Sequence, residues 1–264
     1  MNKKREITQS ELELAFELCG IEKGDILLMH SALSSIGNVK GGSDTVIDAL
    51  LSVLGDEGTL AVVAMSGQHP FDPKTAPSTV GIISETLRKR DGAFRSLKPV
   101  HSVAAIGRDA QALTSGHDVS ETNCGEGTPY TKLRGMGGKI LMLGVDMNRN
   151  TTLHSIEDIM DSYYLENRTV PAPVYMKDHE GKTMTMRKFP PGHRDFLKFT
   201  SVLRRNGALT EGIAGNARML LIDVRKMFEL GEKMLEKDPD YFLCDNDECA
   251  YCHGKKVARD NAVK

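Results

Sequence analysis

Two histidines in this chain stand where a side chain could take a proton from a nucleophile. His101 lies within a short apolar stretch, residues 98–105, and His154 precedes Glu157 by three positions. The imidazole of histidine gains and loses a proton near neutral pH, and a neighbouring carboxylate fixes its tautomer and raises its basicity. These residue types therefore predict a general base oriented by a carboxylate.

Both histidines also have a structural interpretation. A lone histidine ahead of a strand, as at position 101, is commonly a core residue. His154, Glu157, Asp158 and Asp161 share one face of a predicted helix, and an acidic helix face is usually solvated. Inside a cleft, the same face would complement a polycationic substrate. The spacing H-x-x-E is not the H-E-x-x-H pattern of metalloproteases.

A serine- and glycine-rich segment, residues 30–43, joins a predicted strand to a predicted helix. Its glycines permit a tight turn, and the N–H groups at the start of the helix attract anions. Hydroxyls at Ser31, Ser34 and Ser35 add further donors. The segment lacks both the Walker pattern and G-x-G-x-x-G. We interpret it either as a site for a phosphate-bearing ligand or as a polar turn before a capped helix.

Three of the five cysteines crowd together near the end of the chain. Cys244, Cys249 and Cys252 give the spacing C-x4-C-x2-C, with His253 adjacent. Thiolates this close together predict a structural zinc site, although adjacent Cys252 and His253 would be an awkward pair of ligands on one ion. The sequence does not identify a fourth ligand. The alternative is a reduced, mobile C-terminus, since an odd number of cysteines argues against a disulfide framework.

The composition is that of an ordinary globular protein. The 264 residues are 40% hydrophobic and 27% charged, with a net charge of −2. Such a charge gives no reason to expect nucleic acid or an anionic membrane as a partner. No apolar run approaches the roughly 20 residues of a membrane span, and no apolar signal-peptide core follows the basic N-terminus. We expect a cytoplasmic protein with one domain over residues 1–264, including a cysteine-rich tail at about 241–264.

The elements that must hold these groups alternate between strands and helices. Short apolar runs predict strands at residues 25–30, 59–65, 102–106 and 139–145. Helical spacing predicts helices at residues 45–54, 79–90, 151–164, 196–205 and 224–235, and a capping-box pattern at 10–13 predicts another. This alternation is typical of an α/β domain with a largely parallel sheet. Residues 174–176 and 183–186 flank a predicted hairpin turn at 178–181, so we expect the sheet to be mixed.

Taken in order, these segments resemble the aminoglycoside 3-N-acetyltransferase family. The resemblance spans roughly residues 25–220; each piece is weak alone, but the ordered set is specific. The matching pieces are residues 30–37, Gly41-Gly42, residues 71–78, 83–88, 99–105, 124–129, 143–145, 149–154 with Glu157, and 215–217.

The resemblance implies a three-layer α/β/α fold with a central mixed sheet, distinct from the common split-strand acetyltransferase fold. It also implies direct transfer of an acetyl group from acetyl-CoA to the 3-amino group of a 2-deoxystreptamine aminoglycoside. The family's active-site histidine falls on His101 and its partner carboxylate on Glu157, and backbone N–H groups near Ser102 and Val103 could stabilise the oxyanion. The residues that fall where the family holds coenzyme A are His30, Ser31, Ser34, Ser35, Gly41, Gly42, Ser102 and Val103. Those near the antibiotic cleft are Asp72, Glu126, His154 and Asp158.

Three departures from the family pattern bear on the substrate. Asp146-Met147-Asn148 stands where members often carry Gly-His-Asp, Asn38 replaces a common aromatic residue, and Val100 replaces a common threonine. None of them removes the predicted base or its carboxylate. They leave open another amine metabolite as the acceptor, and the cysteine tail leaves open a zinc-dependent binding module. Either a monomer or a homodimer is compatible with the sequence.

Overall fold

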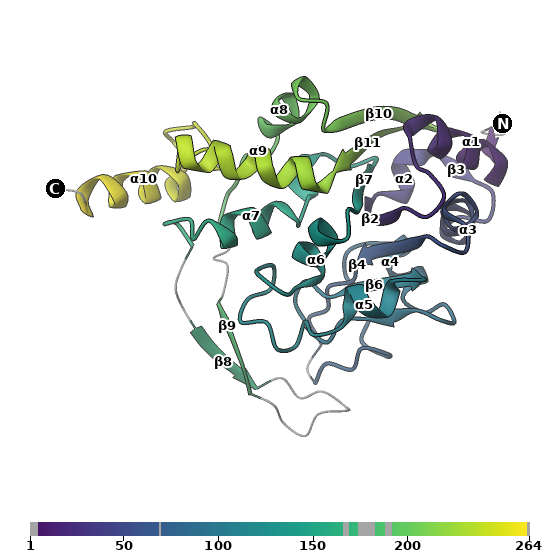
Figure 1. Cartoon of the computed structure of the whole chain (residues 1–264), viewed down its shortest axis with the longest axis horizontal. Helices are drawn as coiled ribbons and strands as arrows, with labels where there is room; N and C mark the ends of the chain where they lie inside the picture. Colours follow the sequence, from purple (N-terminus) through teal and green to yellow (C-terminus); the bar gives the residue numbers. More distant parts are fainter. Residues whose placement is uncertain (1–4, 69, 166–168, 174–182, 188–191, 263–264) are drawn as a thin grey trace.

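The computed structural model describes residues 5–68, 70–165, 169–173, 183–187 and 192–262 (Figure 1). The two termini lie at opposite ends of the molecule. The strands are β1 (Glu6–Ile7), β2 (Ile26–Ser31), β3 (Asn38–Val39), β4 (Thr59–Val63), β5 (Phe94–Arg95), β6 (Val103–Gly107), β7 (Lys139–Leu143), β8 (Thr169–Pro173), β9 (Thr183–Arg187), β10 (Leu209–Ala214) and β11 (Ala217–Asp223). The helices are α1 (Gln9–Cys19), α2 (Leu33–Ile36), α3 (Ser43–Leu54), α4 (Ile82–Leu87), α5 (Ala110–Thr114), α6 (Pro129–Gly135), the 3-10 helix η1 (Met147–Arg149), α7 (Leu153–Ile159), α8 (Phe199–Arg205), α9 (Val224–Lys237) and α10 (Ala250–Ala262).

A mixed seven-stranded sheet forms the middle layer, in the order β10-β11-β7-β2-β4-β6-β5. Within this sheet only two pairs are parallel, β2 with β7 and β2 with β4; the other four pairs are antiparallel. The prediction of a mixed sheet is confirmed, but the prediction that it is largely parallel is wrong. The predicted hairpin is also not what makes the sheet mixed, because β8 and β9 pair with each other in a separate two-stranded sheet.

Helices cover both faces of this sheet, which confirms the three-layer fold. Successive side chains of a strand point to opposite faces. In β2, Leu27 and Met29 therefore pack with α1, α3 and α4, whereas Ile26 and Leu28 pack on the side of α5 to α9. Because both faces of β2 are buried, the strand is a continuous apolar run up to His30.

Several predicted boundaries need correction. The capping box of α1 is formed by Thr8 and Glu11, two positions before the predicted pair at 10–13. The helices predicted at 79–90 and 151–164 shorten to α4 and α7. The predicted strand at 183–186 corresponds to β9, which pairs with β8, whereas residues 174–176 and the predicted turn at 178–181 lie outside the described part of the chain.

The cysteine-rich tail is folded rather than extended. It ends in α10, and its residues Leu243, Cys244 and Cys252 pack with Tyr164 and Leu165, which follow α7. The alternative of a mobile C-terminus is therefore not what the structure shows over residues 241–262. Among the described residues, no helix combines the length and apolar character needed to cross a membrane.

Candidate active site

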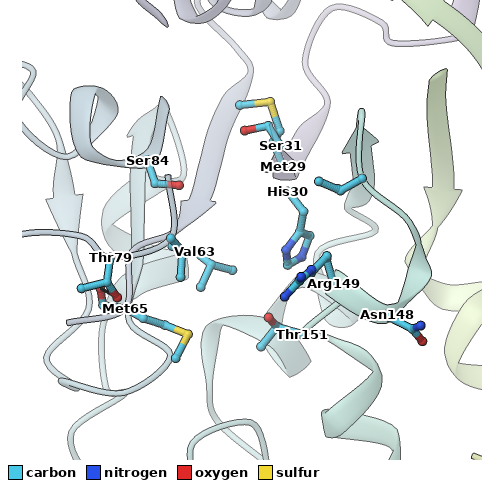
Figure 2. A pocket seen from close by; sticks show the side chains of 12 residues that line it. Met29, His30, Ser31, Val63, Met65, Thr79, Ser84, Asn148, Arg149 and Thr151 are labelled. Atoms are coloured by element: carbon cyan, nitrogen blue, oxygen red, sulfur yellow. Dashed lines mark hydrogen bonds between the residues drawn. The ribbon is translucent and has the colours of Figure 1, made fainter. Parts of the chain in front are cut away.

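A cavity of about 400 Å³ opens at the carboxyl ends of the three parallel strands. Loops that follow parallel strands meet at one edge of a sheet, which is where α/β folds usually hold ligands. Figure 2 shows His30 and Arg149 on one side of the cavity and Met65 and Thr79 on the other. The cavity is lined by Met29, His30, Ser31, Val63, Met65, Thr79, Val80, Ser84, Val145, Asn148, Arg149 and Thr151.

A histidine and an arginine line this cavity, beside the amide of Asn148. His30, at the end of β2, is buried, and its Nε2 has no hydrogen-bond partner among the described residues. Burial lowers the pKa of His30 to about 4, so its imidazole is neutral at physiological pH. Arg149 brings a positive charge from η1, and its side chain forms no ion pair with another described residue. The cavity therefore favours a ligand with both apolar and anionic parts.

The helix α7 begins at the wall of this cavity and carries a buried ionic contact. The backbone N–H of His154 donates to the carbonyl oxygen of Thr151 (3.1 Å), which lines the cavity. One turn further, Glu157 is fully buried, and its Oε2 lies 2.7 Å from Nδ1 of His154. Its other oxygen, Oε1, accepts a hydrogen bond of 2.6 Å from Nε of Arg194.

This contact determines which ring nitrogen of His154 carries the proton. Burial alone would raise the pKa of Glu157, but hydrogen bonds and charge from His154 and Arg194 hold it below its ordinary value. An ionised carboxylate only accepts hydrogen bonds, so Nδ1 of His154 must donate. In the neutral tautomer the basic lone pair of His154 is then on Nε2. The side chain of His154 is 27% exposed, so this histidine can reach a substrate.

His101 differs from the prediction in its partner. Among the described residues, the carboxylate of Glu157 hydrogen-bonds His154 and Arg194 and not His101, while the catalytic roles of His101 and Glu157 stay a prediction. The ring of His101 lies beside His154, with centroids 6.4 Å apart. Burial and the neighbouring His154 lower the pKa of His101 to about 3, which makes it a weak base.

The backbone of His101 adopts a conformation that side chains rarely take. Its φ is 61°, in the left-handed region, and the hydroxyl of Tyr130 donates to its carbonyl oxygen (2.8 Å). Its Nδ1 is buried and has no hydrogen-bond partner among the described residues. Strained backbone of this kind is found at functional sites when the surrounding structure holds it in place. The strain positions the imidazole next to His154 before the strand β6 begins.

The residues predicted to hold coenzyme A are not gathered in one place. His30 and Ser31 line the cavity, but Ser34 and Gly41 lie at separate surface hollows. The hydroxyl of Ser35 donates to the carbonyl oxygen of Gly144 (3.0 Å), and it thereby ties the loop after β2 to the end of β7. Gly42, with a φ of 66°, is the residue before α3, as a turn into a helix requires.

Ser102 and Val103 are both inaccessible. The hydroxyl of Ser102 donates to the carbonyl oxygen of Ala64 (2.5 Å), and the N–H of Val103 donates to Oγ of Ser96 (2.9 Å). Both residues are fully buried. The hydroxyl of Ser102 and the N–H of Val103 are therefore already engaged within the fold, and the role predicted for these two residues stays a prediction.

The predicted acidic residues of the antibiotic cleft lie on different segments. Asp72 accepts a hydrogen bond from the backbone N–H of Lys74 (2.9 Å) through Oδ1, in a turn of the segment after β4. Glu126 is exposed in a hollow that it shares with basic residues of α6 and α9. Asp158, on α7, packs its carboxylate against Gly125 so closely that a Cβ there would lie 2.3 Å from Oδ1.

Two functional candidates were missed by the sequence analysis. Arg149 belongs to a segment singled out for its family resemblance, but its charge was not assigned a role. Arg194 lies 37 residues after Glu157, beyond the reach of any spacing rule. It is itself buried, with its guanidinium 4.7 Å from the ring centre of Tyr164.

The family model and two known relatives that match this chain carry the same description, aminoglycoside 3-N-acetyltransferase. The model of a family described as aminoglycoside 3-N-acetyltransferase matches residues 28–236. The aminoglycoside N(3)-acetyltransferase III of Salmonella sp is 30% identical, with 87% of this chain and 92% of the relative covered. The aminoglycoside N(3)-acetyltransferase VII of Streptomyces paromomycinus is 34% identical over 59% of this chain and 62% of its own length.

Solved structures share the whole fold. The apoenzyme of aminoglycoside acetyltransferase AAC(3)-IVa superposes with a TM-score of 0.85 at 27% identity, covering 97% of this chain and 99% of that one. A variant of the same enzyme in complex with gentamicin has a TM-score of 0.86 at 27% identity, with the same coverage. AAC-IIIb in a binary complex with CoASH has a TM-score of 0.80 at 26% identity, covering 88% of this chain and 97% of that one.

Proposed function

This chain belongs to the aminoglycoside 3-N-acetyltransferase family, and on that premise we propose that it transfers an acetyl group from acetyl-CoA to the 3-amino group of a 2-deoxystreptamine aminoglycoside. The relative crystallised with CoASH and the relative crystallised with gentamicin support the two substrates. The proposal treats residues 1–264 as one catalytic domain.

The observation that carries the mechanism is the contact between His154 and Glu157. An aminoglycoside amine is largely protonated in water, and only its free-base form attacks a thioester. The ammonium form first loses one proton to water, and we assign to Nε2 of His154 the removal of a second proton as the free amine nitrogen attacks the acetyl carbonyl carbon. The C–N bond forms, the C–S bond breaks, and the imidazolium returns its proton to the departing thiolate of coenzyme A.

Glu157 gives His154 an anionic hydrogen-bond partner, which His101 lacks among the described residues. Its buried negative charge stabilises the imidazolium that forms on His154, and interactions between charges strengthen where water is excluded. Arg194 keeps Glu157 ionised and oriented in the absence of substrate. His101, with its pKa lowered to about 3, is neutral throughout the reaction and forms the wall of the site beside His154.

The cavity at the strand ends suits the acetyl donor. Coenzyme A combines an apolar and amide-bearing arm with phosphate groups. Met29 and Met65 offer apolar walls for the arm, and Arg149 offers a charge for a phosphate. His30 and Ser31 add polar atoms at the end of β2.

The acceptor site is assigned to the acidic residues of the neighbouring segments. We propose that Asp72, Glu126 and Asp158 complement the positive charges of the aminoglycoside, with His154 at its reacting amine. The same chemistry on another amine metabolite is the alternative acceptor.

The experiment is to follow thiol release from acetyl-CoA with a panel of 2-deoxystreptamine antibiotics, and to identify the product by mass. Acetylation of the 3-amino group by the folded protein is the expected result. If another amine supports thiol release but none of the antibiotics does, the acceptor is that amine and not an aminoglycoside. No release with any amine would overturn the proposed activity.

A further inference from the structure

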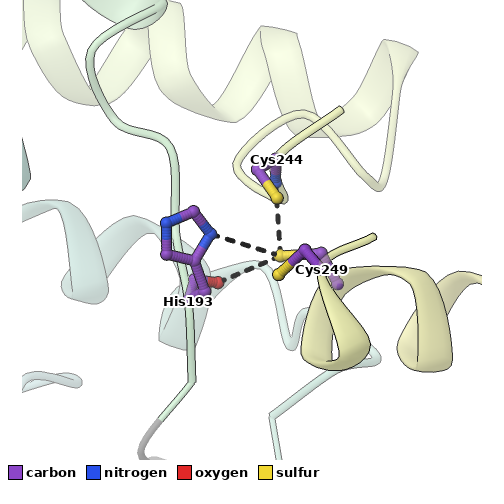
Figure 3. Close-up of side chains that lie close together, drawn as sticks. His193, Cys244 and Cys249 are labelled. Carbon is purple, nitrogen blue, oxygen red and sulfur yellow. Dashed lines mark hydrogen bonds between the residues drawn. The ribbon is translucent and has the colours of Figure 1, made fainter. Parts of the chain in front are cut away.

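Four metal-binding side chains outside the active site come together at the C-terminal end of the chain. His193, Cys244, Cys249 and Cys252 place their ligand atoms within 4.8 Å of one another (Figure 3). They come from two segments far apart in the sequence, the loop before α8 and the stretch that leads into α10. The spacing of the three cysteines predicts a metal site, and the fold brings His193 to it as the fourth member.

The geometry points to a structural zinc ion, and we propose that these four residues bind it. Three thiolates and one imidazole are a common tetrahedral set for zinc, and soft sulfur ligands select zinc over magnesium or calcium. Zn–S bonds of 2.3 Å in a tetrahedron separate the sulfurs by about 3.8 Å. Nδ1 of His193 lies 3.8 Å from Sγ of Cys252, so small rotations of the side chains close the site. All three cysteines are free thiols.

Groups around the cluster would stabilise its charge. Three thiolates around Zn²⁺ carry a net charge of −1. The backbone N–H of Cys244 donates to Sγ of Cys252 (3.3 Å), as backbone donors commonly do to zinc-bound thiolates. The ammonium groups of Lys198 and Lys256 donate to the carbonyl oxygens of Leu243 (2.7 Å) and Cys244 (3.0 Å), and both also pair with the carboxylate of Asp245 (3.4 and 3.5 Å).

His193 is a better fourth ligand than His253. A residue directly after Cys252 in a helix points about 100° away from it, so both could not face one ion. His253 is exposed on α10 and does not belong to the cluster. His193 approaches from a separate segment, and its backbone carbonyl oxygen also lies 3.3 Å from Sγ of Cys252.

The zinc site also bears on the active site, an inference that rests on the proposed function. Arg194, the residue after His193, donates to the carboxylate of Glu157. Its guanidinium lies between two tyrosine rings, 4.7 Å from the centre of Tyr164 and 5.4 Å from that of Tyr251, which stands between two of the cysteines. A bound ion would therefore restrain Arg194 in two ways. It would hold the preceding residue, His193, and it would fix α10, whose Tyr251 packs on the guanidinium. We assign it the task of holding Arg194 against Glu157.

The first test is the metal content of the protein as purified without chelators. We expect about one zinc per chain, retained on gel filtration. The variants are His193→Ala, which should lose most of the zinc, His193→Cys, which should keep it as a four-thiolate site, and the matched control His253→Ala, which should keep it. If His193→Ala fails to fold, the variant Cys249→Ser is measured in its place. It removes the most exposed of the three cysteine ligands and should also lose most of the zinc. Less than about a tenth of an equivalent of zinc in the native protein, with no tetrahedral cobalt absorption after addition of Co²⁺, would overturn the site.

The second test addresses the link to the active site and needs no activity. Amide hydrogen exchange is compared before and after zinc removal by a chelator. We expect faster exchange at 192–196 and in α7, and no change in β2 or α1. Unchanged exchange in α7 would refute the anchoring role while leaving the metal site intact. Because neither readout uses acetyl transfer, failure of the proposed enzymatic function is recognised separately.

Discussion

Replacing Glu157 with glutamine tests the proposed mechanism most directly. The change keeps the size of the side chain but removes the charge that contacts His154 and Arg194 at 2.7 and 2.6 Å. A glutamine amide has one oxygen and one NH2 group, so it cannot accept hydrogen bonds from both partners through separate oxygens. Either His154 loses its acceptor or Arg194 faces another donor.

This change has two effects, one on the reaction rate and one on folding stability. Without the carboxylate, the imidazolium on His154 loses its stabilising charge, and general-base contributions of this kind are worth about 10²- to 10⁴-fold in rate. This corresponds to about 2.7 to 5.4 kcal/mol of transition-state stabilisation. The buried Arg194 also loses its counter-charge, which costs roughly 3 to 5 kcal/mol of folding stability when one partner of a buried pair is removed.

The assay must separate these effects. Initial rates of thiol release give kcat and kcat/KM at a temperature where circular dichroism shows the variant folded. The matched control is Glu211→Gln, because Glu211 also contacts two arginines, Arg204 and Arg218, but at the surface on β10. We expect the control to lose at most about 1 kcal/mol of stability and no activity.

A folded Glu157→Gln protein that keeps more than about a third of the wild-type kcat/KM would refute the reasoning, since general-base contributions are larger than that. A double-mutant cycle sharpens the result. If Glu157 acts through His154, its replacement in a His154→Ala background should produce little further loss of rate. Additive losses would show that Glu157 acts by another route.

Three further predictions address other parts of the site. His154→Ala should lower kcat by about 10²- to 10⁴-fold in the thiol-release assay, whereas His101→Asn, which tolerates the left-handed backbone, should keep most turnover; the reverse order would restore His101 as the base. Arg149→Ala should raise the KM for acetyl-CoA roughly 10- to 100-fold with kcat little changed, as loss of a charged hydrogen bond predicts, and an unchanged KM would remove Arg149 from the donor site. Burial, with Lys98 nearby, lowers the pKa of His117 to about 3 from 6.5, so the folded state binds fewer protons than the unfolded state. Stability should therefore fall as the pH drops from about 6.5 toward 3, by about 1.4 kcal/mol per pH unit for this residue, and urea unfolding of His117→Gln should show a correspondingly smaller pH dependence.

The sequence predicts the fold where local rules apply. The apolar run of β2 and the helical periodicity of α3 and α9 identify those elements to within a few residues. Strand direction is different, because it depends on connections such as residues 64–102 between β4 and β6, whose path has no local signature. The sheet was therefore expected to be largely parallel, although β6 runs antiparallel to β4.

The residues of the candidate sites also fall into two groups: those whose contacts follow from local spacing, and those that only the folded chain brings together. His154 and Glu157 are one helical turn apart, so their contact is readable from spacing. Arg194 and His193 act across distances of tens of residues, and only the folded chain brings them to Glu157 and to the cysteines. The contact of Ser102 has the same origin, since Ala64, which accepts the hydrogen bond of its hydroxyl, lies 38 residues earlier in the chain.

The restriction of parallel pairing to β7, β2 and β4 has an evolutionary consequence. The connection after β4 carries Asp72 together with the cavity residues Met65 and Thr79, whereas Glu126 lies on the connection between β6 and β7. Substitutions between β6 and β7 can therefore change the surroundings of Glu126 without altering the cavity lining, whereas substitutions between β4 and α4 can alter the surroundings of Asp72 and the cavity together. The family departures at Asp146-Met147-Asn148 follow β7 directly, so they would be expected to alter handling of the acetyl donor more than the range of antibiotics.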